Sequence, residues 1–251
     1  MARAYIGTSG WVYKSWRQGF YAGIPARAWL GHAANVFGAL EINGSFYTQI
    51  KAETFTRWRE QTPDEFRFAL KGHRFITHYK RLIDCDDSVR RLRDPARKLG
   101  EKLHAVVWQL PSTMKADVPR LARFMKSLKL WRDVRHAMEL RHASWFTDEV
   151  ARVLEDAEVA VCLSDAPDFP MWRRVTTDLV YVRLHGHTRK YASSYPRPSL
   201  SRWAVEIDRW MREGRDVHAY LDNDAEGAAA RNAITLREEL AALTGAPAPG
   251  P

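Results

Sequence analysis

Residues 104–141 read HAVVWQLPSTMKADVPRLARFMKSLKLWRDVRHAMELR. Two short runs, His104–Gln109 and His136–Arg141, flank an amphipathic segment, Val118–Leu128. The runs have the length and the apolar composition of strands in a parallel sheet, and the segment between them has the periodicity of a surface helix. A β–α–β unit of this kind predicts two parallel strands joined by a covering helix.

The same alternation extends over most of the chain. Six further strand-like runs bring the count to eight: Ala4–Thr8, Ala39–Asn43, Phe66–Lys71, Ala160–Asp165, Leu179–His185 and Val217–Asn223. Eight regularly spaced units favour an α/β fold closed into a (β/α)8 TIM-like barrel, for which about 250 residues is a typical length. An open doubly wound sheet is the alternative. No GxGxxG sequence follows the first run, which weakens a dinucleotide-binding fold, and no organic cofactor is expected.

Helices are expected between these strands. In chain order they are Ala26–Val36, Ala52–Gln61, Asp86–Lys102, Val118–Leu128, Thr147–Asp156, Ser199–Glu213 and Ala225–Leu243. Pro95 is expected to kink or split the third helix, and Thr147 to cap the fifth. Residues 166–178, between strands six and seven, form a short stretch with two prolines. This crossover is therefore expected to be degenerate, without a full helix.

The composition predicts one globular domain over residues 1–244. Hydrophobic residues make up 45% of the 251 residues, which is enough for a full core without disulfides. Residues 245–251 are rich in Gly, Pro and Ala and are expected to form a disordered tail. No apolar run reaches the ~18 residues of a membrane span, and the first residues lack the apolar stretch of a signal peptide. We therefore expect a cytoplasmic protein with no membrane contact.

The net charge of +9 predicts an anionic partner, either a small molecule or a nucleic acid. The densest basic stretch is Arg90–Lys102. It is interpreted as the solvated face of a helix, with a nucleic-acid surface as the alternative. No obligate protein partner is indicated.

In a closed β/α barrel the functional groups come from the C-terminal ends of the strands, which form the mouth of the barrel. The predicted catalytic residues are Glu41, Glu139, Asp165 and His185. The predicted substrate-binding residues are Ser9, Trp11, Asn43, Lys71, His78, Gln109, Arg141, His142, Arg183, Tyr191 and Asn223. Because unpaired charges inside a barrel are costly, the charged residues are expected to pair with one another, and pairs such as Glu41 with Arg183 and Glu139 with Lys71 filling the mouth would favour a purely structural role. Such a network could also cap the barrel without any chemistry.

Several blocks of the sequence carry a family resemblance. They are IGTSGWVYKSW, FYAG, EINGSFYT, FRFALKGHRFITH, QLPSTMK, ELRHASWF, YVRLHGHTRKY and DNDAEGAAARNA, spread between about Tyr5 and Leu240. In this order they resemble the domain of unknown function 72 (YecE-like) family. The resemblance implies a β/α barrel and leaves the reaction open. It also implies an Asn where this chain has Asp222, so this chain adds a negative charge if that position faces the mouth.

Three functions remain open from the sequence. The first is an enzyme that hydrolyses a phosphate-containing substrate, in which Lys71, Arg141 and Arg183 hold oxygens while a carboxylate and a histidine act as base and acid. A divalent metal is an alternative occupant of the same site, although its ligands would be scattered over separate strands. The second is a carbohydrate-active hydrolase, lyase or isomerase that uses Glu41 and Glu139 as a carboxylate pair. The third is a non-enzymatic nucleic-acid-binding protein.

Overall fold

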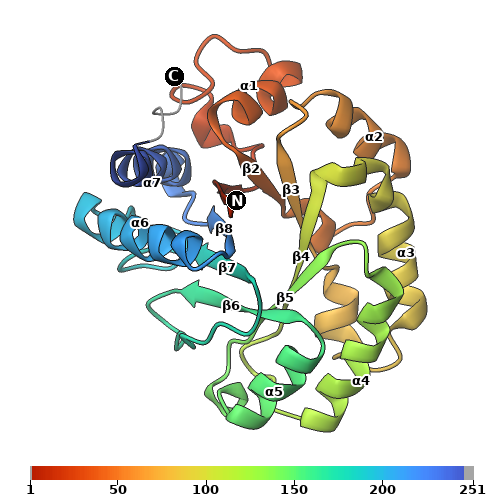
Figure 1. Ribbon diagram of the computed structural model, residues 1–251. Coiled ribbons are helices and arrows are strands. Elements are labelled where there is room, and N and C mark those ends of the chain that lie inside the picture. Colours follow the sequence, from red (N-terminus) through yellow and green to blue (C-terminus); the bar gives the residue numbers. More distant parts are fainter. Residues whose placement is uncertain (1, 246–251) are drawn as a thin grey trace.

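The computed structural model describes residues 2–245 of the chain, apart from the side chain of residue 226 (Figure 1). Its centre is a closed barrel of parallel strands in the order β1 to β8, in which β1 pairs with β8 to close the circle. The expected (β/α)8 TIM-like barrel is confirmed. The expected tail, residues 245–251, lies outside the described residues except for Gly245.

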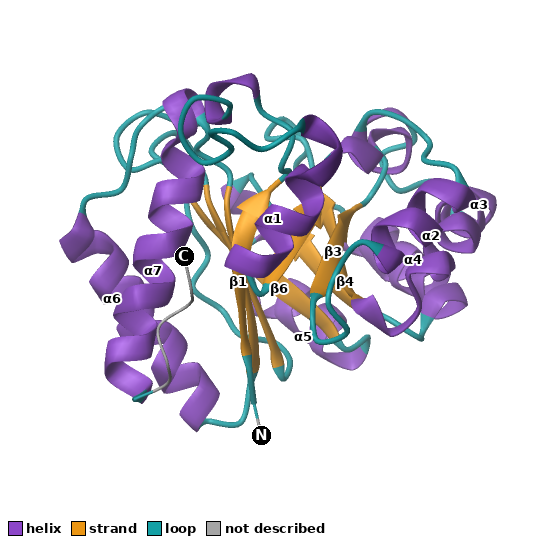
Figure 2. Ribbon diagram, turned by 90° about the horizontal axis from the view of Figure 1, so that it is seen from above, coloured by secondary structure: helices purple, strands orange, loops and turns teal. Residues whose placement is uncertain are grey.

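All eight expected strands are present, with ends that differ from the predictions by no more than two residues. They are β1 Ala4–Ser9, β2 Ala39–Ile42, β3 Arg67–Lys71, β4 Leu103–Gln109, β5 Arg135–Glu139, β6 Val159–Asp165, β7 Leu179–Leu184 and β8 Asp216–Leu221. Helices surround them in an outer ring (Figure 2). They are α1 Trp29–Val36, α2 Ala52–Glu60, α3 Asp86–Ala96, α4 Val118–Leu128, α5 Asp148–Asp156, α6 Arg197–Arg212 and α7 Ala228–Thr244.

The outer ring is interrupted between β6 and β7, where residues 166–178 form an irregular loop instead of a helix (Figure 1). The expected degenerate crossover is therefore confirmed. Pro95 lies in the last turn of α3, and the chain continues from there as a 3-10 turn over Arg97–Lys102. Thr147 caps α5, because its side chain accepts a hydrogen bond from the Val150 amide.

The barrel interior is filled by a few large rings set against small residues. Tyr5, Tyr181 and Tyr220 come from β1, β7 and β8, and alanines on the strands between them give these rings room. The outward faces of the strands pack against the helices and form the main core. The interior is thus solid at mid-height, so a ligand can enter only at an end.

Among the described residues, the helices are too short or too polar to cross a bilayer.

Gly7 on β1 permits the close approach of β1 and β2. A Cβ at this position would lie 1.7 Å from the Ala39 carbonyl oxygen, which belongs to the neighbouring strand. We predict that Gly7→Ala lowers the free energy of unfolding by roughly 3 kcal/mol, measured by urea unfolding. Gly38→Ala is the matched control, because a Cβ there meets no atom within 4 Å. Equal unfolding midpoints for the two variants would contradict this account of barrel closure.

Candidate functional site

The C-terminal ends of the strands bring a set of polar side chains into the mouth. Seven strands carry a polar residue at or next to their C-terminal end. The residue two positions earlier in the chain belongs to the apolar interior of the barrel, and because side chains alternate along a strand, the polar residue also points inward. The inward residues placed in this way are Glu41, Lys71, Gln109, Glu139, Ser164, Arg183 and Asp222. The mouth is therefore a polar layer that rests directly on the solid apolar interior.

Arg183 is the centre of this layer and is completely buried. Its guanidinium donates to both oxygens of Glu41, at 2.7 and 3.1 Å, and to Glu139 Oε2 at 2.7 Å. It also donates to Asp222 Oδ2 and to Ser9 Oγ, each at 3.1 Å. Burial alone would lower the pKa of Arg183, but the three carboxylates raise it well above its usual value. One permanent cation thus holds three carboxylates from different parts of the barrel.

Glu139 is also completely buried and lies between two arginines. Besides the bond from Arg183 it accepts from Arg141 Nε at 2.6 Å and from Ser164 Oγ at 3.0 Å. Burial raises the pKa of Glu139, but Arg141 and Arg183 together lower it by more, and the net pKa is well below the usual value. Glu139 is therefore ionised near neutral pH and has no proton to donate.

His185 lies beneath the mouth surface between two carboxylates. Its Nε2 is 3.0 Å from Ser164 Oγ and 3.3 Å from Glu139 Oε1, and its Nδ1 is 3.0 Å from Asp222 Oδ2. Burial raises the pKa of Asp222, but Arg183, His185 and Lys71 lower it to about 2. Asp222 thus faces the site and adds the negative charge that the sequence suggested.

Lys71 differs from the other charged residues of the mouth. Its side chain is only 5% exposed, yet among the described residues no carboxylate lies within 4.0 Å of its ammonium group. Lys71 does not pair with Glu139, because both oxygens of Glu139 are taken by arginines. The ammonium instead lies 4.3 Å from the centre of the Phe46 ring. Burial, followed by the charge of Arg183, lowers the pKa of Lys71 to about 8.

His78 shows that the region around Lys71 is electropositive. It is half-buried, and its ring meets Phe46 edge to face at 5.1 Å. Burial and the charges of Lys71, Arg141 and Arg74 lower the pKa of His78 to about 4. His78 is therefore neutral at physiological pH.

Two aromatic residues cover the β5 to β7 side of the mouth. Phe169 belongs to the irregular loop after β6, and Tyr191 to the loop after β7. The Arg141 guanidinium lies 4.7 Å from the Phe169 ring centre and donates to Tyr191 Oη at 3.3 Å. The His185 ring lies 5.6 Å from Phe169 and 5.5 Å from Tyr191. These loops therefore seal His185 from solvent.

Most of the predicted site residues come together at this end of the barrel. Those that share the mouth are Ser9, Glu41, Lys71, His78, Gln109, Glu139, Arg141, Arg183, His185 and Tyr191. Asn43 and His142 follow their strands at the start of short 3-10 turns. The Asn43 Oδ1 atom is buried without a hydrogen-bond partner, and the His142 ring accepts from the Ser144 amide.

Asp165, predicted to be catalytic, lies on the outside of the barrel. Its carboxylate accepts from Trp203 Nε1 of α6 at 3.2 Å. Alternation along β6 explains the difference, because Ser164 points inward and its neighbour must then point outward. Ser164, which was not among the predicted site residues, takes the place in the mouth.

Trp11 and Asn223 also lie away from the mouth. The Trp11 ring meets Trp58 of α2 at 5.0 Å and belongs to the main core. Asn223 donates to the Ser193 carbonyl and to Asn232 Oδ1. It therefore anchors the loop that carries Tyr191.

Besides Ser164, three further participants were not among the predicted site residues. Tyr181 donates to Glu41 Oε2 at 2.7 Å, and its inward position follows from the same period of two that places Arg183. Phe46 lies in a 3-10 turn after β2. Phe169 lies in an irregular loop, so no strand pattern indicates that it covers Arg141.

Among the described residues, no three His, Cys, Asp or Glu side chains are arranged to bind a metal ion together. The inward carboxylates are turned onto Arg183, so their oxygens already have partners. The donor set of the mouth therefore does not fit the divalent metal considered from the sequence.

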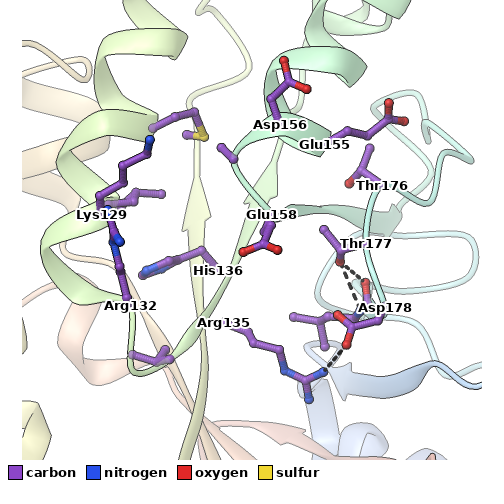
Figure 3. A pocket seen from close by; sticks show the side chains of 15 residues that line it. Lys129, Arg132, Arg135, His136, Glu155, Asp156, Glu158, Thr176, Thr177 and Asp178 are labelled. Atoms are coloured by element: carbon purple, nitrogen blue, oxygen red, sulfur yellow. Dashed lines mark hydrogen bonds and ion pairs between the residues drawn. The ribbon is translucent and has the colours of Figure 1, made fainter.

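A separate cavity of about 750 Å³ lies at the opposite end of the barrel, beside α4 and α5 (Figure 3). Lys129 and Arg132 line one side, and Glu155 and Glu158 line the other. Glu158 is exposed to solvent. Because the N-terminal end of β/α barrels contributes mainly to stability, we place the candidate site at the mouth.

The sequence and the fold are similar to known proteins. The family model described as "Protein of unknown function DUF72" matches residues 5–251. UPF0759 protein YecE of Escherichia coli (strain K12) is 33% identical over 143 residues, which are 57% of this chain and 50% of YecE. The match therefore spans about half the length of that relative. UPF0759 protein YunF of Bacillus subtilis (strain 168) is 22% identical over 81% of this chain and 83% of its own.

Two solved structures share the fold. A DUF72 family protein from Thermotoga maritima has a TM-score of 0.84 at 24% identity, over 95% of this chain and 99% of its own. A DUF72 family protein from Enterococcus faecalis has a TM-score of 0.81 at 20% identity, over 96% and 95%. At these identities the likeness concerns the barrel fold.

Removing Arg183 should destabilise the fold, because the buried carboxylates lose their counter-charge. We predict that Arg183→Met lowers the free energy of unfolding by roughly 4 kcal/mol. Arg97→Met is the control: Arg97 pairs with Asp133 on the exposed surface, and its loss should change stability only slightly. Urea unfolding followed by circular dichroism measures both. Equal effects of the two substitutions would show that Arg183 does not organise the mouth.

Proposed function

This chain belongs to the DUF72 family, and we propose that it is an enzyme that binds a small phosphate-containing anion at the mouth of its barrel and hydrolyses it by general acid/base catalysis. The observation that carries the proposal is the Lys71 ammonium, which among the described residues has no carboxylate within 4.0 Å although the neighbouring charges are paired. A buried cation without a counter-ion is costly, and an anionic ligand would remove that cost.

Arg141 provides the second contact to the anion. Its Nη2 forms an ion pair with Glu139 Oε1 at 2.5 Å, and its Nη1 donates a hydrogen bond to Tyr191 Oη at 3.3 Å, so the Nη1 side of the guanidinium is the side that can take up a ligand. A guanidinium edge of this kind suits phosphate oxygens, which accept hydrogen bonds from two nitrogens of one fork. Lys71 and Arg141 both act on His78 by their charge, so the two cations serve the same region of the mouth.

His78 is the proposed general acid. Burial and the neighbouring cations keep it neutral in the free protein. A bound phosphate would offset those cations and raise its pKa, so that it could protonate the leaving oxygen. Transfer of a phosphoryl group to water needs mainly positioning and charge stabilisation, because its transition state is loose. Glu41, Glu139 and His185 would then hold Arg183 and Arg141 in place beneath the substrate.

The carbohydrate alternative is less well supported. Glu41 and Glu139 contact the same guanidinium, so Arg183 occupies the space that a sugar would need between two catalytic carboxylates. Neither carboxylate is exposed in the mouth. A glycosidase mechanism would require Arg183 to leave its buried position.

The nucleic-acid alternative depends on the basic run Arg90–Lys102. Arg93 donates to the Leu130 carbonyl, and Arg97 pairs with Asp133. The Lys102 ammonium is buried against the Thr62 carbonyl at the N-terminal end of β4. These cations are engaged within the protein and extend away from the mouth, which favours a small anion over a polymer.

The proposal is tested by phosphate binding and phosphate release. We expect inorganic phosphate to bind in calorimetry, and Lys71→Gln to weaken binding roughly tenfold or more through loss of a charge-assisted contact. Hydrolysis of glycerol phosphate, whose alkoxide leaving group needs a proton, should fall in His78→Gln while phosphate affinity is retained, and para-nitrophenyl phosphate, whose leaving group needs none, should be affected less.

Lys190→Gln is the matched control, because this lysine also lies near the mouth but pairs with Asp168. If it weakened phosphate binding as much as Lys71→Gln, the attraction would be diffuse and no specific site would exist. Phosphate binding without any hydrolysis by the unaltered protein would contradict the enzymatic part.

A further inference from the structure

We propose that Lys71 is also a covalent site, whose amine adds to the carbonyl carbon of a small anionic aldehyde or ketone held in the mouth. The inference takes the anion contact at Arg141 from the proposed function, but it does not require phosphoester hydrolysis. Lys71 has a buried amine with no carboxylate within 4.0 Å among the described residues, and the Arg141 guanidinium lies in the same mouth under Phe169. Together they point to a ligand that carries both a carbonyl and an anionic group.

The side chain of Lys71 is held in position at its backbone and at its ammonium group. Its backbone carbonyl accepts a hydrogen bond from the completely buried Ser45 Oγ at 2.6 Å, and the same hydroxyl lies 2.7 Å from the Ile42 carbonyl. The next residue, Phe46, places its ring 4.3 Å from the Lys71 ammonium. The 3-10 turn Gly44–Phe46 therefore fixes both the start and the end of this side chain.

The surroundings of Lys71 favour the neutral amine. Glu41, Glu139 and Asp222 lie in the same layer, but each is turned onto Arg183. The charge of Arg183 and the burial of Lys71 act together against the ammonium form. An unprotonated amine is the nucleophile in imine formation, and desolvation beside another cation is a known way to produce it. Reaction with a carbonyl would also remove the cost of burying this charge.

The position of Arg141 selects the class of carbonyl compound. Its side chain is 9% exposed, and the Nη1 side of the guanidinium, which donates to Tyr191 Oη, can bind a phosphate or carboxylate on the same molecule. Phe169 and Tyr191 cover Arg141, so a bound molecule would be shielded from water, which would otherwise hydrolyse the imine. A neutral aldehyde would lack the anchoring contact and should react more slowly.

The reaction balances without any further reagent. The nitrogen lone pair of Lys71 forms a bond to the carbonyl carbon, and the carbonyl oxygen takes up a proton. The resulting carbinolamine loses this oxygen as water together with the second amine hydrogen, and a C=N bond remains. Added borohydride then supplies a hydride to the imine carbon and fixes the ligand as a secondary amine.

The test uses the full chain with glycolaldehyde phosphate, followed by sodium borohydride and peptide mass mapping. We expect Lys71 to be labelled roughly tenfold faster than exposed lysines at neutral pH, since a lower pKa frees more amine while only partly reducing its nucleophilicity. The labelling rate should rise with pH and level off above about 8, the pKa of Lys71. Glycolaldehyde itself should label Lys71 more slowly than its phosphate ester.

Two substitutions serve as controls. Lys71→Arg keeps the positive charge and removes the amine, so selective labelling should vanish, whereas Lys129→Arg at the opposite end of the barrel should leave it unchanged. Labelling spread evenly over exposed lysines of the unaltered chain would overturn the inference, whatever the folding of the variants. If Lys71 reacts selectively but phosphate does not compete, the covalent site stands and the proposed anion site fails. If phosphate binds but Lys71 stays unlabelled, the anion site stands and the covalent site fails.

Discussion

The buried guanidinium of Arg183 is the interaction on which the upper part of this barrel depends. Three carboxylates, Glu41, Glu139 and Asp222, converge on it from β2, β5 and the segment after β8. Burying three carboxylates beside this cation costs less than burying them alone. Because all three are committed to Arg183, Lys71 has no carboxylate partner within 4.0 Å among the described residues. The unpaired state of Lys71 is thus a consequence of how Arg183 is satisfied.

The charged side chains are paired differently at the two ends of the barrel. At the N-terminal end Arg135 binds Asp216 at 2.8 Å, and His104 and His218 are hydrogen-bonded to each other beside Tyr5. These groups satisfy one another and close that end. At the mouth, the described residues place no carboxylate within 4.0 Å of the buried Lys71 ammonium, and Arg141 lies under Phe169 and Tyr191. A ligand would gain more at the mouth, because there it completes contacts that the protein lacks.

The sequence predicted the eight strands because buried parallel strands are continuous apolar runs separated by helices. The same continuity explains why Asp165 was misplaced: a strand that is apolar on both faces does not reveal which residue points inward. Trp11 was misplaced because Gly10, at φ +87°, turns the chain away from the mouth after Ser9. The partner of Glu139 could not be predicted either. It depends on which of several cationic side chains from distant strands lies nearest to the carboxylate in the folded barrel.

The central claim is that the mouth contains an anion site between Lys71 and Arg141. The most direct measurement is a crystal structure of the protein soaked in tungstate, an oxyanion whose metal gives a strong anomalous signal. The account predicts an anomalous peak within hydrogen-bond reach of Lys71 Nζ and Arg141 Nη1. A mouth without a peak, with tungstate bound instead beside Lys129 and Arg132 in the cavity at the other end, would contradict it.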